Sequence, residues 1–136
     1  MSTTNEKILT AYFDAIDSQD LDRLRHFVHD DIVYEDKVLK ETFNGPEAIL
    51  ALWDTWYKHT RFGARIDEMI VQDDRYAIVC TMYGEYIKEI PGFGPASGQS
   101  YEFQVVSIGR LRDGKIVHNS DFWNKSDFLA ALGNLD

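Results

Sequence analysis

The sequence has very little cysteine and few basic residues, and each shortage excludes a class of protein. Cys80 is the only cysteine, so the chain has no intrachain disulfide and no metal cluster held by several thiolates. It lies in a strand-like run, where we expect a small buried side chain. Lys and Arg number 14 against 23 Asp and Glu, giving a formal net charge of −9. Because binding to a phosphate backbone needs clustered basic residues, we predict no nucleic-acid partner.

Long apolar stretches are also lacking. No segment approaches the roughly 20 apolar residues of a membrane-spanning helix, and residues 1–6 contain no apolar core of a secretion signal. These absences predict no membrane partner and a cytoplasmic location. The 136 residues, 44% hydrophobic and 27% charged, fit one globular domain over residues 1–136.

The first half of the chain shows apolar residues at helical spacing, which predicts three helices. Thr3 and Glu6 form a candidate capping box for the first helix, and Pro46 suits the first turn of the third. Asp30-Asp31 is expected to end the second helix before a brief strand at 32–36. The apolar faces comprise Ile8, Leu9, Tyr12, Phe13 and Ile16, then Leu21, Leu24, Phe27 and Val28, then Ile49, Leu52, Trp53, Trp56 and Tyr57.

From residue 64 the apolar period changes to two, which indicates strands. The segment 90–98 is rich in Gly and Pro and is predicted to be a loop that could act as a lid. A short last helix is expected to begin at Ser126 and end at Gly133. We predict antiparallel strands at roughly 64–72, 75–89, 99–112 and 115–124, with tight turns at Asp73-Asp74 and Asp113-Gly114.

Alternation assigns the side chains of the last two strands to opposite faces of the sheet. Helices would cover one face, and the sheet would curl into an α+β fold with a concave interior. The interior contains polar residues that a purely structural core would not choose, which predicts a small-molecule pocket. The inward set is Tyr101, Phe103, Val105, Ser107, Gly109, Val117, Asn119, Asp121 and Trp123; the outward set is Glu102, Gln104, Val106, Ile108, Arg110, Ile116, His118, Ser120 and Phe122.

The outward face is more apolar than a solvated surface requires. Val106, Ile108 and Phe122 lie there among Gln104 and His118. A second copy of the chain could cover these apolar side chains by sheet-to-sheet packing. We therefore predict a homodimer formed through this face.

The sequence contains no recognisable metal or nucleotide motif. The four histidines are scattered, no pair shows the helical spacing of zinc ligands, and His118 is expected on the outer face. No phosphate-binding glycine pattern precedes a predicted helix. We therefore predict that the protein uses no metal and no cofactor.

Several short sequence strings, spread along nearly the whole chain, occur in an order that is typical of one protein family. They are Ala11-Tyr12-Phe13, Asp20-Leu21, residues 30–36 (DDIVYED), residues 44–49 (NGPEAI), Pro95-Ala96-Ser97-Gly98, residues 113–117 (DGKIV), Asp121-Phe122-Trp123 and residues 128–133 (FLAALG). They resemble the nuclear transport factor 2-like superfamily, in particular its SnoaL-like polyketide cyclase and ketosteroid isomerase branches. The resemblance implies a cone-shaped barrel of N-terminal helices packed on a curved, mostly antiparallel sheet, with a deep apolar pocket, and commonly a homodimer.

The same resemblance implies roles for individual residues. Asp36 stands where ketosteroid isomerases have their general base, Tyr12 where they have an oxyanion donor, and Trp123 beside the base. Ser107 stands where those enzymes have a protonated aspartate as second donor. In SnoaL-like cyclases an acid/base aspartate comes from the final strand, which Asp121 matches. Epoxide hydrolases of this fold need an arginine between two aspartates in the pocket, but alternation places Arg110 on the outer face.

These residues suggest proton transfer next to a carbonyl. Asp36 would be the base and Tyr12 the oxyanion donor, with Asn119 or Ser107 as a second donor. Burial would raise a carboxyl pKa toward the working range, and two coupled carboxyls could leave one protonated. The expected pocket wall consists of Trp53, Trp56, Phe103, Val105, Ser107, Asn119 and Trp123.

We therefore expect a cofactor-independent acid/base enzyme, an isomerase, cyclase or dehydratase, acting on an apolar cyclic small molecule. Alternatives stay open for each residue: Asp36 as a solvated turn carboxylate, Asp121 as a structural acceptor and Tyr12 as a packing residue. Alternatives also stay open for the whole protein. These are a non-catalytic binding or accessory protein, an epoxide hydrolase, and an interaction module with a filled cavity.

Overall fold

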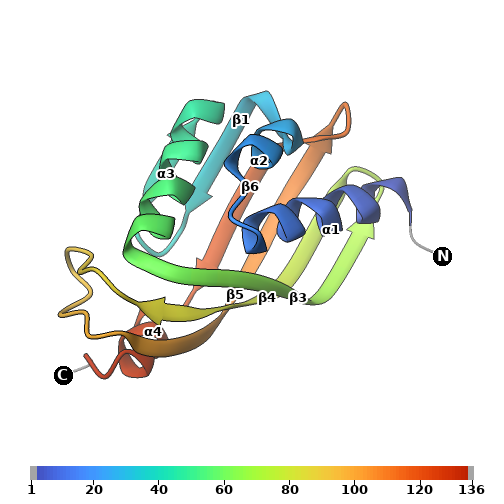
Figure 1. The fold of residues 1–136 in the computed structure, drawn as a ribbon. Coiled ribbons are helices and arrows are strands. Elements are labelled where there is room, and N and C mark those ends of the chain that lie inside the picture. Colours follow the sequence, from blue (N-terminus) through green and yellow to red (C-terminus); the bar gives the residue numbers. More distant parts are fainter. Residues whose placement is uncertain (1–2, 135–136) are drawn as a thin grey trace.

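The structure is a computed structural model that describes residues 3–134 (Figure 1). Three helices lie on one side of a curved sheet, and a fourth, short helix lies at one end of it. In chain order these residues form α1 (Thr4–Asp17), α2 (Leu21–Phe27), β1 (Val28–Asp36), β2 (Glu41–Asn44), α3 (Pro46–His59), β3 (Thr60–Gln72), β4 (Arg75–Tyr86), β5 (Gln99–Arg112), β6 (Lys115–Trp123) and α4 (Lys125–Ala131).

The sheet is mixed but mostly antiparallel, with the strand order β2-β1-β6-β5-β4-β3. Only β1 and β6 run parallel among the pairs formed by residues 3–134. The register sets Cys80 opposite Val105 and Ser107 opposite Asp121. Directly opposite residues share a face, so these side chains lie together on the helix-covered, concave side. This arrangement confirms the predicted α+β fold.

Local sequence signals determine where the helices begin. Thr3 and Glu6 form the predicted capping box: the Thr3 hydroxyl accepts the Glu6 N–H at 3.1 Å, and the Glu6 carboxylate accepts the Thr3 N–H at 3.3 Å. Pro46 lies in the first turn of α3 as expected. The cap of α4 is Asn124, which accepts a backbone N–H at 3.1 Å, and the prediction of Ser126 was wrong. Both residue types cap helices well, so residue type does not decide between them.

The prediction for the segment after the second helix was wrong. Helix α2 ends at Phe27, and Val28 already belongs to β1, where it pairs with Ile116 of β6. Asp30-Asp31 therefore lies within a strand and does not terminate a helix. The short edge strand β2 was not predicted either. Both differences have one cause, since pairing between β1 and β6 joins residues far apart in sequence and leaves no local periodicity.

The four long strands were predicted correctly except near their ends. β3 begins at Thr60, directly after α3, and β4 ends at Tyr86, before the loop. In β6 a register shift leaves Val117 without a partner on β5, and Ile116 and Val117 are both buried. The outward orientation predicted for Ile116 was therefore wrong, because an inserted residue locally interrupts the alternation of faces.

The loop that joins β4 to β5 is held in place rather than free to open. The Tyr86 hydroxyl accepts the Ile90 N–H at 2.8 Å and donates to the Gly94 carbonyl at 2.7 Å. The Asn134 amide donates to the Phe93 carbonyl at 3.0 Å, and the Phe93 ring is buried. These contacts anchor the loop to β4 and to the chain after α4, which argues against the lid considered for this loop.

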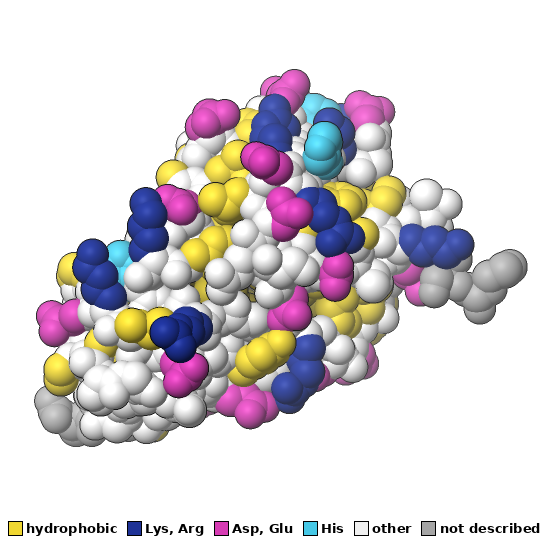
Figure 2. Space-filling view, in the orientation of Figure 1, with side chains coloured by type: hydrophobic (Ala, Val, Ile, Leu, Met, Phe, Trp, Pro, Cys, Tyr) yellow, Lys and Arg dark blue, Asp and Glu magenta, His cyan; other side chains and the backbone are white. Residues whose placement is uncertain are grey.

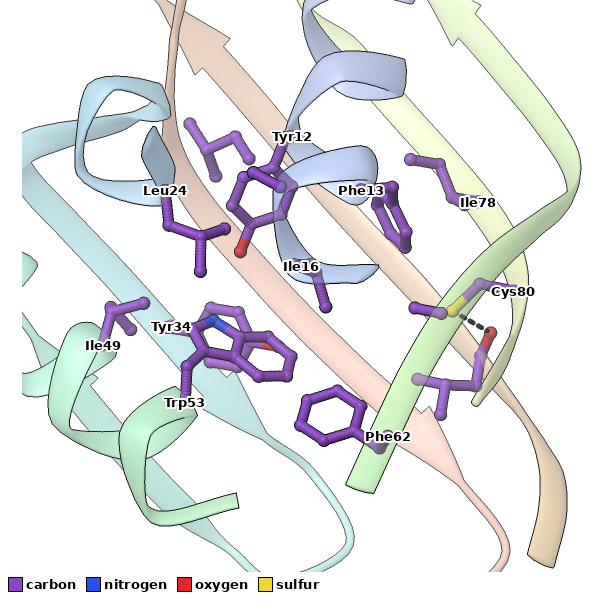
Figure 3. Close-up of a cluster of buried hydrophobic side chains, with 14 of the residues drawn as sticks. Tyr12, Phe13, Ile16, Leu24, Tyr34, Ile49, Trp53, Phe62, Ile78 and Cys80 are labelled. Atoms are coloured by element: carbon purple, nitrogen blue, oxygen red, sulfur yellow. Dashed lines mark hydrogen bonds between the residues drawn. The ribbon is translucent and has the colours of Figure 1, made fainter. Parts of the chain in front are cut away.

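A cluster of buried side chains fills the space between the helices and the sheet (Figure 3). Cys80 is among them, as expected for a small buried residue, and burial raises the pKa of its thiol to about 12. The labelled members come from six elements and are Tyr12, Phe13, Ile16, Leu24, Tyr34, Ile49, Trp53, Phe62, Ile78 and Cys80.

The face formed by the helices carries charges of both signs. Figure 2 shows Lys and Arg side chains distributed among Asp and Glu side chains on this face. Such mixing suits a solvated surface. No helix within residues 3–134 combines the length and the apolar character needed to cross a membrane.

Candidate active site

A cavity lies between the helices and the concave face of the sheet. The centre of a water molecule can reach about 80 Å³ of it. Nine aromatic side chains line it, and its charged lining residues are Asp36, Glu41 and Asp121. Glu41, at the start of β2, is the one exposed lining residue, so the cavity opens near the β1–β2 connection. It is of a size for a small molecule or for one ring system of a larger one.

All ten residues predicted for the site line this one cavity. The sequence analysis therefore found the location of the cavity, although the roles that it assigned remain predictions. The ten are Tyr12, Asp36, Trp53, Trp56, Phe103, Val105, Ser107, Asn119, Asp121 and Trp123.

Asp121 accepts hydrogen bonds from three side chains. Its Oδ1 accepts from the Ser107 hydroxyl at 2.6 Å and from the Asn119 amide at 2.8 Å, and its Oδ2 accepts from the Tyr34 hydroxyl. Asp121 is partly exposed, because it faces the cavity, but it lies deep within the protein. This desolvation raises the pKa of Asp121, the three donors oppose the rise, and the nearby charge of Asp36 adds to it.

A hydrogen bond from Tyr76 of β4 fixes the orientation of Asn119 in this network. The Tyr76 hydroxyl donates to Asn119 Oδ1 at 2.7 Å, so the Asn119 amide must present its N–H group to Asp121. Ser107 and Asn119 thus both donate to a carboxyl of the protein. The Ser107 hydroxyl therefore has no hydrogen left for a ligand, whereas the Asn119 amide has one further N–H.

Asp36 ends β1 and has a different environment. Its Oδ1 accepts the backbone N–H groups of Val38 and Leu39 at 3.0 and 2.9 Å, which fixes the turn after the strand. The Trp123 indole N–H donates to Oδ2 at 3.1 Å and to Oδ1 at 3.2 Å. Trp123 thus lies beside Asp36, as the resemblance implies. The turn alone would explain Oδ1, whereas Oδ2 has the indole N–H as its partner.

Tyr12 and Trp53 approach each other on the helix-covered side of the cavity. Figure 3 shows the Tyr12 hydroxyl, from α1, directed toward the indole nitrogen of Trp53, from α3. Burial raises the pKa of Tyr12 well above the usual tyrosine range, the Asp121 charge adds to this, and the nearby Trp53 N–H opposes it. The two atoms do not form a hydrogen bond of normal geometry, because Trp53 Nε1 is buried without a partner among residues 3–134.

Sequence reasoning missed Tyr34 and Tyr76. Tyr34 is two residues before Asp36 in β1, so alternation puts both on the inner face, and this signal could have identified it. Desolvation, with the charge of Asp121, raises the pKa of Tyr34 well above its usual range. Tyr76 is the second residue of β4, and it reaches Asn119 across β5. No local sequence pattern indicates this contact between strands.

The outer face carries a separate charged group. Lys37 donates to Glu35 at 2.7 Å and His118 contacts the same carboxylate at 2.9 Å, which together lower the pKa of Glu35 to about 2. Neither His118 nor Arg110 lines the cavity. The predicted outward orientation of both residues agrees with this. Within residues 3–134 no group of three or more His, Cys, Asp and Glu side chains is placed to hold a metal ion.

Comparison with known proteins identifies the family. The model of the SnoaL-like domain matches residues 9–119. The chain belongs to the SnoaL-like domain family. This result confirms the resemblance read from the sequence. A search of curated protein sequences gave no match for this SnoaL-like chain.

Solved structures of the same fold cover nearly the whole SnoaL-like chain. A candidate polyketide cyclase from Xanthomonas campestris pv. campestris has 20% identity and a TM-score of 0.88, covering 95% of this chain and 96% of that one. IdmH, a candidate polyketide cyclase from Streptomyces antibioticus, has 22% identity and a TM-score of 0.84, covering 95% and 98%. A protein with a ketosteroid isomerase-like fold from Catenulispora acidiphila has 21% identity and a TM-score of 0.80, covering 96% and 94%. At these identities the comparison shows a shared fold.

Proposed function

We propose that this protein is a cofactor-independent acid/base enzyme that moves a proton on a small, mostly apolar molecule next to a carbonyl group. Isomerisation, aldol-type cyclisation and dehydration all contain such a step. The observation that carries the proposal is the desolvated carboxyl of Asp121 inside the cavity, whose pKa is raised. A carboxyl with a raised pKa is a stronger base than a solvated one and can both accept and return a proton.

The partners of Asp121 suit a group that changes its protonation state. Ser107 and Tyr34 contact it through hydroxyl groups, which can donate or accept. When Asp121 is ionised, both hydroxyls donate to it. When it is protonated, one of them can rotate and accept the new O–H. The Asp121 carboxyl therefore has hydrogen-bond partners in either state.

Asp36 supports this role from the open end of the cavity. It lines the same cavity, and its charge is one of the causes that raise the pKa of Asp121. We assign the proton transfer to Asp121, which takes the α-proton as a carboxylate and returns it as the acid; the Asp36 charge would make Asp121 the stronger base, and Tyr12 would donate to the carbonyl oxygen.

The test uses 2-tetralone, a bicyclic ketone, as the probe. In D₂O near neutral pH, the protein should accelerate the exchange of the α-hydrogens of 2-tetralone for deuterium, measured by proton NMR. Saturable binding without acceleration would instead support the non-catalytic binding protein. The absence of both would contradict a small-molecule function for the cavity.

We also propose that the protein is a homodimer formed through the outer face of the sheet. Ile108 is 48% exposed and Phe122 is 43% exposed, on neighbouring central strands. Covering them would remove apolar surface from water. Sedimentation velocity at micromolar concentration should show a dimer, and Ile108→Lys should give a monomer. Ile87→Lys, which changes an exposed side chain in the β4–β5 loop, is the control. A monomeric wild type would contradict this proposal.

A further inference from the structure

Trp53 carries a buried polar group with no hydrogen-bond partner. Its indole Nε1 is out of contact with solvent and has no partner among residues 3–134. The residue as a whole is also buried, with 7% of its surface exposed. Buried polar groups in native proteins are nearly always paired, so an exception needs an explanation. Trp123 of the same cavity shows the ordinary behaviour, since its indole N–H donates to Asp36.

The neighbour of this unpaired N–H is the Tyr12 hydroxyl. Figure 3 shows the hydroxyl pointing from α1 toward the Trp53 nitrogen, within an otherwise hydrophobic cluster. The hydroxyl takes no part in the hydrogen bonds around Asp121, whose donors are Ser107, Asn119 and Tyr34. Both residues line the cavity. The site thus places a donor without an acceptor beside a hydroxyl whose hydrogen is not used elsewhere in the network.

We propose that Trp53 is a positioning residue for Tyr12: its N–H donates to the Tyr12 oxygen while the Tyr12 O–H donates to an oxygen atom of the ligand. A hydroxyl has one hydrogen to give. With the indole N–H on its oxygen, that hydrogen must point away from Trp53. Tyr12 then acts as a donor, and the ligand atom that it meets must be an acceptor.

This arrangement specifies the class of ligand group. A carbonyl oxygen qualifies, and an enolate oxygen qualifies more strongly, because hydrogen bonds to charged acceptors are stronger. A donor that polarises Tyr12 strengthens the next bond in the chain. Trp53 would therefore favour the charged form of a ligand oxygen over the neutral form. The inference depends on the proposed function only where it calls that oxygen a carbonyl.

Phenols test the inference, because they are planar and carry one oxygen whose charge can be set by ring substitution. Binding of an ionised nitrophenolate and of the matching methyl ether would be measured by calorimetry for the wild type and for Trp53→Phe. We expect Trp53→Phe to weaken phenolate binding by about tenfold or more and binding of the ether by less than about twofold. Circular dichroism would verify the fold.

Two comparisons separate this effect from loss of packing. Trp56→Phe removes the same indole from the same helix and cavity wall, and it should change phenolate and ether binding alike. In a Tyr12→Phe background, Trp53→Phe should cause no further loss of phenolate affinity, because the oxygen that couples the two groups is gone. This second comparison also serves if Trp53→Phe alone folds poorly.

Three results would overturn the inference. They are equal losses for phenolate and ether in Trp53→Phe, additive losses in the Tyr12→Phe background, and no phenolate binding by the wild type at millimolar concentration. The outcome is separate from that of the tetralone exchange. A phenolate preference that depends on Trp53, without exchange, would remove the catalytic proposal and keep this one. Exchange without that preference would keep the catalytic proposal and remove the proposed role of Trp53.

Discussion

Replacing Asp121 with Asn should slow the exchange of the α-hydrogens of 2-tetralone by about 10²- to 10⁴-fold, the range typical of a positioned acid/base group. Asn keeps the shape of the side chain but cannot take up a proton. The hydroxyls of Ser107 and Tyr34 can rotate to accept from the new amide, so we expect binding of 2-tetralone to persist. The measurement is proton NMR in D₂O with ligand binding measured in parallel.

Asp22→Asn provides the control for this comparison. Asp22 is an exposed residue of α2 and does not line the cavity, so its replacement should leave exchange at the wild-type rate. An Asp121→Asn variant that exchanges as fast as the wild type would deny Asp121 the proton-transfer role, and Asp36 would then be the remaining cavity carboxyl on β1.

Replacing Phe128 with Ala should lower the free energy of unfolding by about 3–5 kcal/mol, as is usual for a buried Phe. The ring is fully buried on α4, with centroid distances of 4.6 Å to Phe103 and 5.1 Å to Tyr101. Phe93 of the β4–β5 loop packs on it at 5.4 Å. The substitution would leave a void where α4, the loop and β5 meet. Urea denaturation would measure the loss.

The same change should also weaken ligand binding. Phe103 and Trp123 contact Phe128 on one side and line the cavity on the other, so the void would let the cavity wall relax. Leu129→Ala is the matched control, because Leu129 lies on the same helix but is only partly buried; its loss should be clearly smaller. A loss below about 1 kcal/mol for Phe128→Ala would contradict this role of the cluster.

The elements whose pattern is local were predictable from the sequence. The capping box of Thr3 and Glu6, the turn at Asp113-Gly114 and the alternation along β5 each depend on neighbouring residues, and the structure agrees with all three. Alternation also brought Ser107 and Asp121 to the same face. For this reason the location of the cavity followed from the sequence before any contact between helices and sheet was known.

Features that depend on distant contacts were not predictable in this way. The parallel pairing of β1 with β6 shortened α2 and turned Asp30-Asp31 into strand residues. The environment of the unpaired Trp53 N–H depends on how α1 and α3 lie over the sheet, because its neighbour Tyr12 comes from α1. Likewise, residue type alone does not show whether a donor is already hydrogen-bonded within the protein. Ser107 could have been a ligand donor by its chemistry, but the structure places it on Asp121.

The most direct test is the titration of the Asp121 carboxyl itself, followed by carbon-13 NMR and assigned by comparison with Asp121→Asn. The account predicts a midpoint above the usual aspartate value of about 3.9, because desolvation disfavours the charged form. With the folded pKa above the unfolded one, the contribution of Asp121 to stability is complete below the unfolded pKa and is lost as pH rises through the folded pKa. A midpoint at or below about 3.9 would contradict the account, since Asp121 would then be an ordinary ionised acceptor.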